Sequence, residues 1–293
     1  MVKWRGRQGS RNIEDRRGVA AGAGGAGLAM LVARLILSRF GIGGVVVLVG
    51  GFFLLSALGL NPMALLQGPA APSASRGPAD DEASQFVSVM LAETETVWGE
   101  IFAASGATYP APTLVLFSGE VNSACGYASA AAGPFYCPGD RKVYLDTSFF
   151  AELSQRFGAP GDFAAAYVIA HEVGHHVQTV TGVSADVRSR QARAGEAERN
   201  ALQVRMELQA DCYAGVWARS ADRLSGILDA GDIEEGLAAA AAIGDDTLQR
   251  NAGRRVTPES FTHGSSAQRA RWFSRGYETG DPSQCDTFAA ASL

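Results

Sequence analysis

Three of the four histidines in this chain lie in one apolar segment, AYVIAHEVGHHVQTVTG, at residues 166–182. His171 and His175 are four residues apart, so on a helix they share one face, one turn apart. Glu172 is rotated about 100° from His171. Unpaired polar groups are costly in an apolar helix, so these side chains need a partner. The HExxH spacing indicates one, because two such histidines can bind zinc while the glutamate acts as a general base.

His176 is the third histidine of this segment. It is rotated about 100° from His175 around the helix, so it does not share the face of the two predicted ligands. We predict that His176 packs inside the domain or supports a ligand from behind, and that it does not bind the metal itself.

A catalytic zinc ion needs a third protein ligand and keeps one position for water. The segment MELQADCYAG places Glu207 and Asp211 four residues apart on one helix face, among apolar neighbours. We predict that Glu207 is the third ligand and that Asp211 accepts the N–H of a ligand histidine and orients it. Two alternatives stay open: the acidic residues form an ordinary charged pair in solvent, or His263 is the third ligand.

The first forty residues are rich in Lys and Arg, and an uncharged stretch follows at Phe40–Leu60. About 20 apolar residues are enough for a helix to cross a bilayer. We therefore predict a basic, Gly-rich cytoplasmic segment at residues 1–39 and a single transmembrane helix after it. A second span at Gly18–Ala33 would form a hairpin that places Arg34 and Arg39 outside the cytoplasm, against the positive-inside rule.

The next segment, residues 61–84, is rich in Pro, Ala, Ser and Gly. This composition is typical of a flexible tether between a membrane and a domain. With the N-terminus in the cytoplasm and one crossing, residues 85–293 form an extracytoplasmic domain.

All four cysteines fall in this predicted domain, and none of them forms a C-x-x-C pair. An even number of cysteines in an oxidising compartment indicates two disulfides. Of three connectivities we favour Cys125–Cys137, which closes a short loop, together with Cys212–Cys285. A zinc–thiolate site is the alternative, although these spacings are not typical of one.

The apolar pattern of the domain has mainly helical periodicity, interrupted by two short β-branched or aromatic runs. We therefore predict an α+β fold that is mostly helical. A cystine-closed loop is expected at residues 123–140. The expected helices lie within 86–106, 149–158, 162–182, 183–221, 222–249 and 265–280, with one or two helices in 183–221. The expected strands lie within 113–119 and 141–146.

The net charge of the chain is −5. No basic stripe runs through the C-terminal two-thirds of the sequence, as a nucleic-acid-binding surface would require. We therefore expect no nucleic-acid partner.

Four segments, HEVGHHVQ, ELQADCYAG, GPFYCPGDRKVYLD and SFTHGSSAQRARWF, occur in this order. Together they resemble the membrane-anchored "putative neutral zinc metallopeptidase" family of bacteria. The resemblance covers the basic start, the apolar stretch and the whole predicted domain. It implies a gluzincin-like peptidase fold in the bacterial cell membrane, with one Zn²⁺ per chain on His171, His175 and Glu207.

His263 is the only histidine outside the 166–182 segment and lies in a Gly/Ser-rich loop. Similar peptidases use a His, Tyr or Arg side chain to hold the oxyanion that forms on the scissile carbonyl. We predict this role for His263, with a structural loop histidine as the alternative. Tyr144 lies on a strand that is either an edge strand, able to align an extended peptide, or an interior strand.

These features predict a zinc peptidase whose substrate is a peptide or protein. Zinc would lower the pKa of a water molecule, and Glu172 would take its proton and pass it to the leaving amine. Two alternatives remain: a membrane-tethered binding or assembly factor without hydrolysis, and a zinc amidase that acts on cell-wall material. Glu172 argues against the binding factor, because a structural metal site needs no base.

Overall fold

The computed structural model describes residues 1–18, 75–76 and 81–293. Residues 1–16 and 75–293 form one compact unit. The predicted transmembrane helix at 40–60 and most of the predicted tether lie outside the described residues. None of the helices within the described ranges combines the length and the apolar character that a membrane crossing needs.

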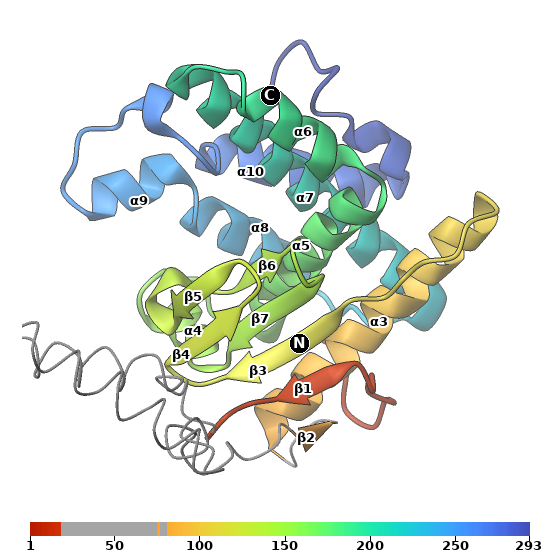
Figure 1. Cartoon of the computed structure of the whole chain (residues 1–293). Helices are drawn as coiled ribbons and strands as arrows, with labels where there is room; N and C mark the ends of the chain where they lie inside the picture. The colour runs from red at the N-terminus through yellow and green to blue at the C-terminus, as the bar shows by residue number, and fades with distance from the viewer. Residues whose placement is uncertain (19–74, 77–80) are drawn as a thin grey trace, which may run out of the picture. The chain divides into compact units, whose positions relative to one another are not determined.

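A five-stranded sheet lies along one side of this unit (Figure 1). Its order is β2 (Ser75–Arg76), β1 (Ile13–Asp15), β3 (Thr113–Phe117), β7 (Lys142–Asp146) and β6 (Phe135–Cys137). The three central strands β1, β3 and β7 are parallel, whereas β2 and β6 pair antiparallel with their neighbours. The two predicted strands are therefore confirmed, and both lie in the interior of the sheet.

The segment between β3 and β7 is more ordered than the predicted loop. It contains the hairpin of β4 (Glu120–Ser123) and β5 (Gly126–Ser129) and then strand β6. The Cys125–Cys137 disulfide ties this hairpin to β6, as the spacing predicted. We did not predict the three strands because this segment is rich in Gly, Ala and Ser, which carry little strand signal.

Helices make up most of the unit, so the α+β, mostly helical prediction is confirmed. The segment 183–221, where one or two helices are expected, contains two that are separated by a turn. The helices are α3 (Glu82–Ala104), α4 (Ser148–Gln155), α5 (Asp162–Val180), α6 (Val183–Gln191), α7 (Glu196–Ser225), α8 (Asp232–Ala242), α9 (Asp245–Asn251) and α10 (Ser266–Thr279). Short 3₁₀ turns occur at Ala130–Ala132, Pro258–Ser260 and Pro282–Cys285.

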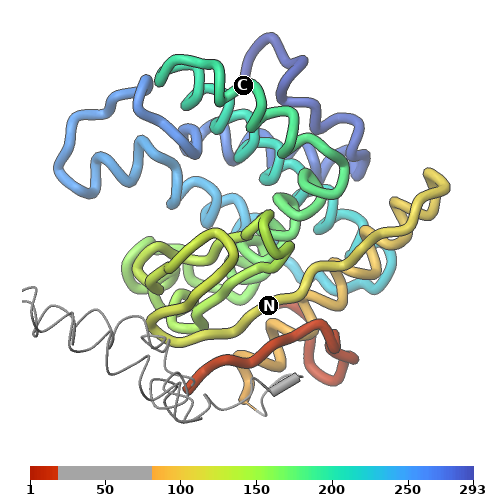
Figure 2. Tube along the Cα trace, viewed as in Figure 1, coloured from red at the N-terminus to blue at the C-terminus, as the bar shows by residue number. Residues whose placement is uncertain are grey.

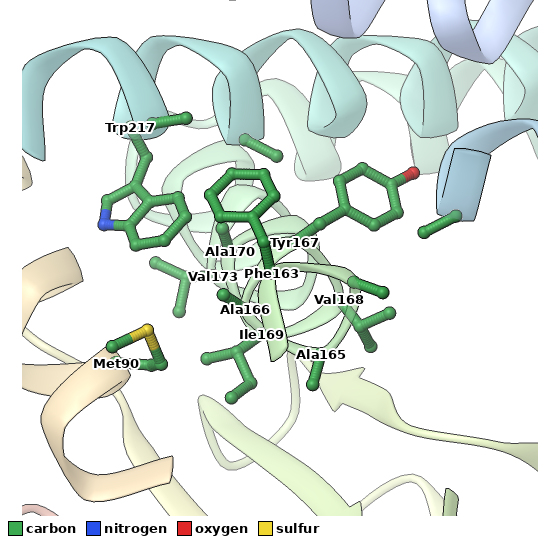
Figure 3. Close-up of a cluster of buried hydrophobic side chains, with 14 of the residues drawn as sticks. Met90, Phe163, Ala165, Ala166, Tyr167, Val168, Ile169, Ala170, Val173 and Trp217 are labelled. Carbon is green, nitrogen blue, oxygen red and sulfur yellow. The ribbon is translucent and has the colours of Figure 1, made fainter. Parts of the chain in front are cut away.

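Helix α5, which carries the HExxH sequence, runs through the middle of the apolar core. Figure 3 shows Phe163 and Tyr167 of α5 on the side facing α7, with Trp217 of α7 beside Phe163, and Met90 of α3 approaching from another side. The rings of Phe163 and Trp217 are stacked, with centroids 6.1 Å apart. Because neighbouring elements surround α5, its polar side chains are held in fixed positions.

Two glycines allow the helices near α5 to cross closely. A Cβ on Gly174 would lie 3.0 Å from the Ala210 carbonyl oxygen, so a larger residue would push α7 away from α5. A Cβ on Gly276 would lie 1.9 Å from the Cys212 carbonyl oxygen, which α10 could not tolerate. The Cys212–Cys285 disulfide, also as predicted, joins α7 to the segment after α10.

The N-terminal residues are part of this folded unit. Figure 2 shows their trace (red) running beside the start of α3 (orange), and Val2, Trp4 and Ile13 are buried. The sequence predicts that residues 1–39 form one cytoplasmic segment. In the structure, however, residues 1–16 belong to the same unit as residues 75–293. The last residues of the predicted tether also belong to the unit, since the Asp81 side chain caps α3.

Candidate active site

The structure brings the three predicted metal ligands together, His171 and His175 from α5 and Glu207 from α7. One donor atom of each residue lies within 4.8 Å of the other two. Glu207 Oε2 is 3.2 Å from His171 Nε2 and 3.5 Å from His175 Nε2. Gly174 lies between His171 and His175 in the sequence, at the point where α5 and α7 cross closely. This close crossing brings Glu207 of α7 near the two histidines of α5.

Both ligand histidines are held through the ring nitrogen that points away from Glu207. His171 Nδ1 lies 2.7 Å from Asp211 Oδ1, and His175 Nδ1 lies 2.9 Å from Gln178 Oε1. The Gln178 amide is fixed in turn, since its Nε2 donates to the Met206 carbonyl at 2.7 Å. Because these oxygens only accept, each Nδ1 carries a proton, and each Nε2 is the ring atom that faces Glu207 and is left for a metal ion.

This donor set fits a zinc ion. Two imidazole Nε2 atoms and one carboxylate form a common catalytic zinc site, and histidine ligands usually donate their second N–H to a carboxylate or amide oxygen. The site also attracts positive charge. Burial lowers the pKa of His171, but the Asp211 carboxylate outweighs this effect and raises that pKa to about 9. Burial raises the pKa of Glu207, but the neighbouring His175 and His171 hold it well below its ordinary value.

Asp211 is fully buried in a network that the sequence did not reveal. Arg269 of α10 donates from Nε to Oδ2 and from Nη2 to Oδ1, both at 2.9 Å. The Tyr167 hydroxyl donates to Oδ1 at 2.5 Å. Burial raises the pKa of Asp211, but the charges and hydrogen bonds of Arg269 and His171 together outweigh burial and lower it to about 2. Asp211 is therefore ionised and held rigidly behind His171.

Glu172 differs from the other acidic residues of the site. It lines the cleft, and its carboxylate accepts no hydrogen bond from the described part of the chain. Burial raises the pKa of its carboxyl group above the ordinary value. A carboxylate that is poorly solvated and has no fixed donors is well suited to accept a proton from a water molecule.

His176 does not join the ligands. Its Nε2 lies 2.6 Å from the Pro110 carbonyl oxygen and therefore carries the proton, so Nδ1 accepts from the Tyr136 hydroxyl at 3.1 Å. Burial lowers the pKa of His176, in keeping with a neutral ring. The third histidine thus fastens strand β6, through Tyr136, to helix α5.

His263 lies in the loop before α10 and lines the same cleft, with its side chain 50% exposed. Its Nδ1 is 3.2 Å from Asp245 Oδ1. The second oxygen of Asp245 accepts the backbone N–H groups of Thr262, His263 and Gly264. The hydrogen bond to Asp245 raises the pKa of His263, although burial opposes it. The ligand cluster contains Glu207 and does not contain His263.

The cleft has a volume of about 570 Å³ and follows α5 from Tyr167, before His171, to Thr179, after His175. Strand β6 forms one wall. It is the last strand of the sheet, so its outer edge has no strand partner among the described residues. Tyr144 lies on β7, between β3 and β6, which decides for the interior-strand alternative.

The two ends of the cleft differ in character. The segment that leads into α5 contributes Phe149 and Phe157, whose rings are 6.2 Å apart. Helix α6, which follows α5, contributes mostly polar side chains, including Arg188 and Gln191. The cleft is therefore aromatic at one end and polar at the other.

Comparison with known proteins agrees with the geometry. The model of the family described as "Putative neutral zinc metallopeptidase" matches residues 2–288. "Uncharacterized protein YpfJ" of Escherichia coli (strain K12) is 48% identical over 294 residues, covering 98% of this chain and 99% of that protein.

"Uncharacterized protein Mb2605" of Mycobacterium bovis is 46% identical over 226 residues, covering 72% of this chain and 74% of that protein. No solved structure matches the chain. The family match spans both the metal ligands and the residues that support them, and this chain belongs to the "Putative neutral zinc metallopeptidase" family.

Proposed function

We propose that this protein is a zinc-dependent peptidase with a gluzincin-like active site. The observation that carries the proposal is the cluster of His171, His175 and Glu207, in which hydrogen bonds to the two Nδ1 atoms orient both Nε2 atoms towards Glu207. Glu172 lies beside this point on a cleft large enough for a peptide segment. A purely structural metal site would need neither the base nor the open cleft.

The side chains suggest how the reaction proceeds. When bound, zinc would lower the pKa of an attacking water molecule and polarise the scissile carbonyl. Glu172 accepts a proton from this water while the water oxygen attacks the carbonyl carbon. Glu172 then delivers the proton to the leaving nitrogen. Asp245 raises the pKa of His263 and so favours its imidazolium form, in which Nδ1–H stays on Asp245 and Nε2–H is able to donate to the oxyanion.

The cleft supports an extended peptide as the substrate. The outer edge of β6 offers backbone groups with which a peptide could pair as an additional strand. Phe149 and Phe157 at the aromatic end offer an apolar surface for a large side chain of the peptide. We therefore expect cleavage near large apolar residues.

The two disulfides, Cys125–Cys137 and Cys212–Cys285, support a proposal about the compartment. Disulfides of this kind form and persist in oxidising environments, and thiols are kept reduced in the bacterial cytoplasm. We therefore place the active site outside the cytoplasm.

Purified full-length protein, loaded with zinc in detergent, tests the proposal against a complex peptide mixture whose new termini are read by mass spectrometry. Wild type should cleave peptides. Glu172→Gln should retain about one zinc per chain and lose cleavage, because it removes the base and no ligand. His171→Ala should lose the zinc.

Zinc-loaded wild type that is as inert as Glu172→Gln would contradict a peptidase. Hydrolysis of amide bonds in cell-wall fragments, with no cleavage of any peptide, would favour an amidase instead.

A further inference from the structure

The N-terminal segment, residues 1–16, is built into the zinc-binding domain. Strand β1 pairs in parallel with β3, with Ile13 opposite Leu114 and Asp15 opposite Leu116. Trp4 packs edge-on against Phe86 of α3, with ring centroids 5.6 Å apart. Burial of each large apolar side chain of this kind contributes to holding the segment in place.

The basic residues of this segment are also paired within the domain. Arg7 forms an ion pair with Glu93 of α3 at 3.1 Å and donates to the Ser225 carbonyl at the end of α7. Lys142 of β7 contacts Glu14 of β1 at 2.6 Å. Arg7 of this segment thus has partners on two elements of the domain, α3 and α7, and the acidic Glu14 of the same segment has one on a third, β7.

These contacts place a constraint on membrane topology. Paired strands lie about 4.8 Å apart, whereas the hydrocarbon core of a bilayer is about 30 Å thick. A strand therefore cannot pair with β3 from the opposite side of a membrane. We propose that residues 1–16 and the zinc site lie in the same compartment, so that the chain between residues 17 and 74 leaves and returns on one side.

This topology replaces the single crossing, with its cytoplasmic N-terminus, that the sequence predicted. If the disulfides place the domain outside the cytoplasm, the N-terminus is also outside. In the sequence, Arg34 and Arg39 lie between the apolar stretches 18–33 and 40–60. With both ends outside, these two arginines would face the cytoplasm, which agrees with the positive-inside rule.

The proposal does not depend on the proposed function, and its test reads labelling instead of activity. Two variants of the full-length chain each carry one new cysteine at an exposed position, Gln8→Cys before β1 and Ala238→Cys on α8. A membrane-impermeant maleimide is applied to bacterial cells before and after the inner membrane is permeabilised. We expect both positions to be labelled without permeabilisation.

Labelling of both positions only after permeabilisation would agree with one compartment for residues 1–16 and the zinc site. It would show, however, that this compartment is the cytoplasm. Labelling of Ala238→Cys without permeabilisation, and of Gln8→Cys only after it, would overturn the proposal and restore the single crossing.

The packing that underlies the proposal has a separate test on the purified full-length protein. Trp4→Ala should lower the melting temperature by roughly 6–20 °C, since it removes a buried aromatic side chain from the core. Arg11→Ala, an exposed position in the same segment, is the matched control and should leave it unchanged. Equal melting temperatures for the two variants would show that the segment is not packed and would remove the basis of the proposal.

Discussion

The histidines of two histidine–aspartate pairs line the same cleft, yet the surroundings of the two pairs differ. The side chains of His171 and Asp211 are 7% and 0% exposed, with 2.7 Å between Nδ1 and Oδ1. The corresponding distance between His263 and Asp245 is 3.2 Å, and the His263 side chain is 50% exposed. One pair is enclosed by protein, and the other lies partly in solvent.

The partners of the two aspartates explain this difference. Asp211 is bonded by side chains from two other helices, Tyr167 on α5 and Arg269 on α10, so it can move only if three helices move. Asp245 is bonded by backbone N–H groups of the His263 loop. The first pair can hold a ligand at a constant position, whereas the second can follow a charge that appears during the reaction.

The largest expected effect is a loss of stability when the enclosed pair, His171 and Asp211, loses the positive charge of Arg269. Arg269→Met leaves the Asp211 carboxylate buried without its cation, which should cost about 3–5 kcal/mol of unfolding free energy. Arg271→Met, an exposed position on the same helix, should cost no more than about 0.5 kcal/mol. Chemical denaturation of both variants measures the difference, and equal stabilities would contradict the structural importance of the network.

Changes in the exposed pair, His263 and Asp245, should alter the rate of the proposed reaction and leave the zinc content unchanged. His263→Ala removes one oxyanion donor, so kcat should fall about 10²–10³-fold. The zinc content should stay at that of wild type, because His263 is not in the ligand cluster. Steady-state kinetics together with metal analysis test this expectation, and loss of zinc from His263→Ala would make this histidine a ligand.

The two aspartates should differ in their effect on metal affinity. Asp211→Asn weakens the support of His171, and losses of this kind typically cost about 10–100-fold in affinity. Asp245→Asn should leave the zinc affinity unchanged. Chelator competition on folded samples compares the two variants. A loss of affinity of the same size in both would show that the pairs are not distinct.

The smallest expected effect is a shift of the pH profile. Asp245 raises the pKa of His263, so the charged imidazolium is present below that pKa and is lost as the pH rises through it. Asp245→Asn should therefore move the alkaline limb of the kcat profile to lower pH. Asp246→Asn is the control, because this neighbouring carboxylate is bonded to Ser266 and Arg250 and not to His263. Identical shifts in both variants would contradict the assignment.

The sequence predicted the parts of the site that depend on local periodicity. Spacings of four residues place His171 with His175, and Glu207 with Asp211, on the faces of two helices, and apolar neighbours indicate that both helices are buried. The Cys125–Cys137 pairing also follows from a short spacing. In each case the residues are close in the chain, so the pattern is sufficient.

The contacts that the sequence did not predict join residues that are distant in the chain. Arg269 reaches Asp211 across 58 positions, and β1 reaches β3 across about 100. Strand β1 is only three residues long, Ile-Glu-Asp, and two of them are acidic, so it carries no strand pattern. Its pairing depends on tertiary contacts alone, and this is why the basic flank suggested a separate segment.

The dependence of the site on α5, α7 and α10 has a consequence for how the protein matures. A chain synthesised only as far as α5 has two imidazoles and no third ligand, and until α10 has docked, Asp211 lacks the cation that compensates its buried charge. Three protein ligands characterise a catalytic zinc site, and metal binding is coupled to folding. We therefore expect tight zinc binding only once the chain is nearly complete, with the ion taken from the compartment in which α10 docks.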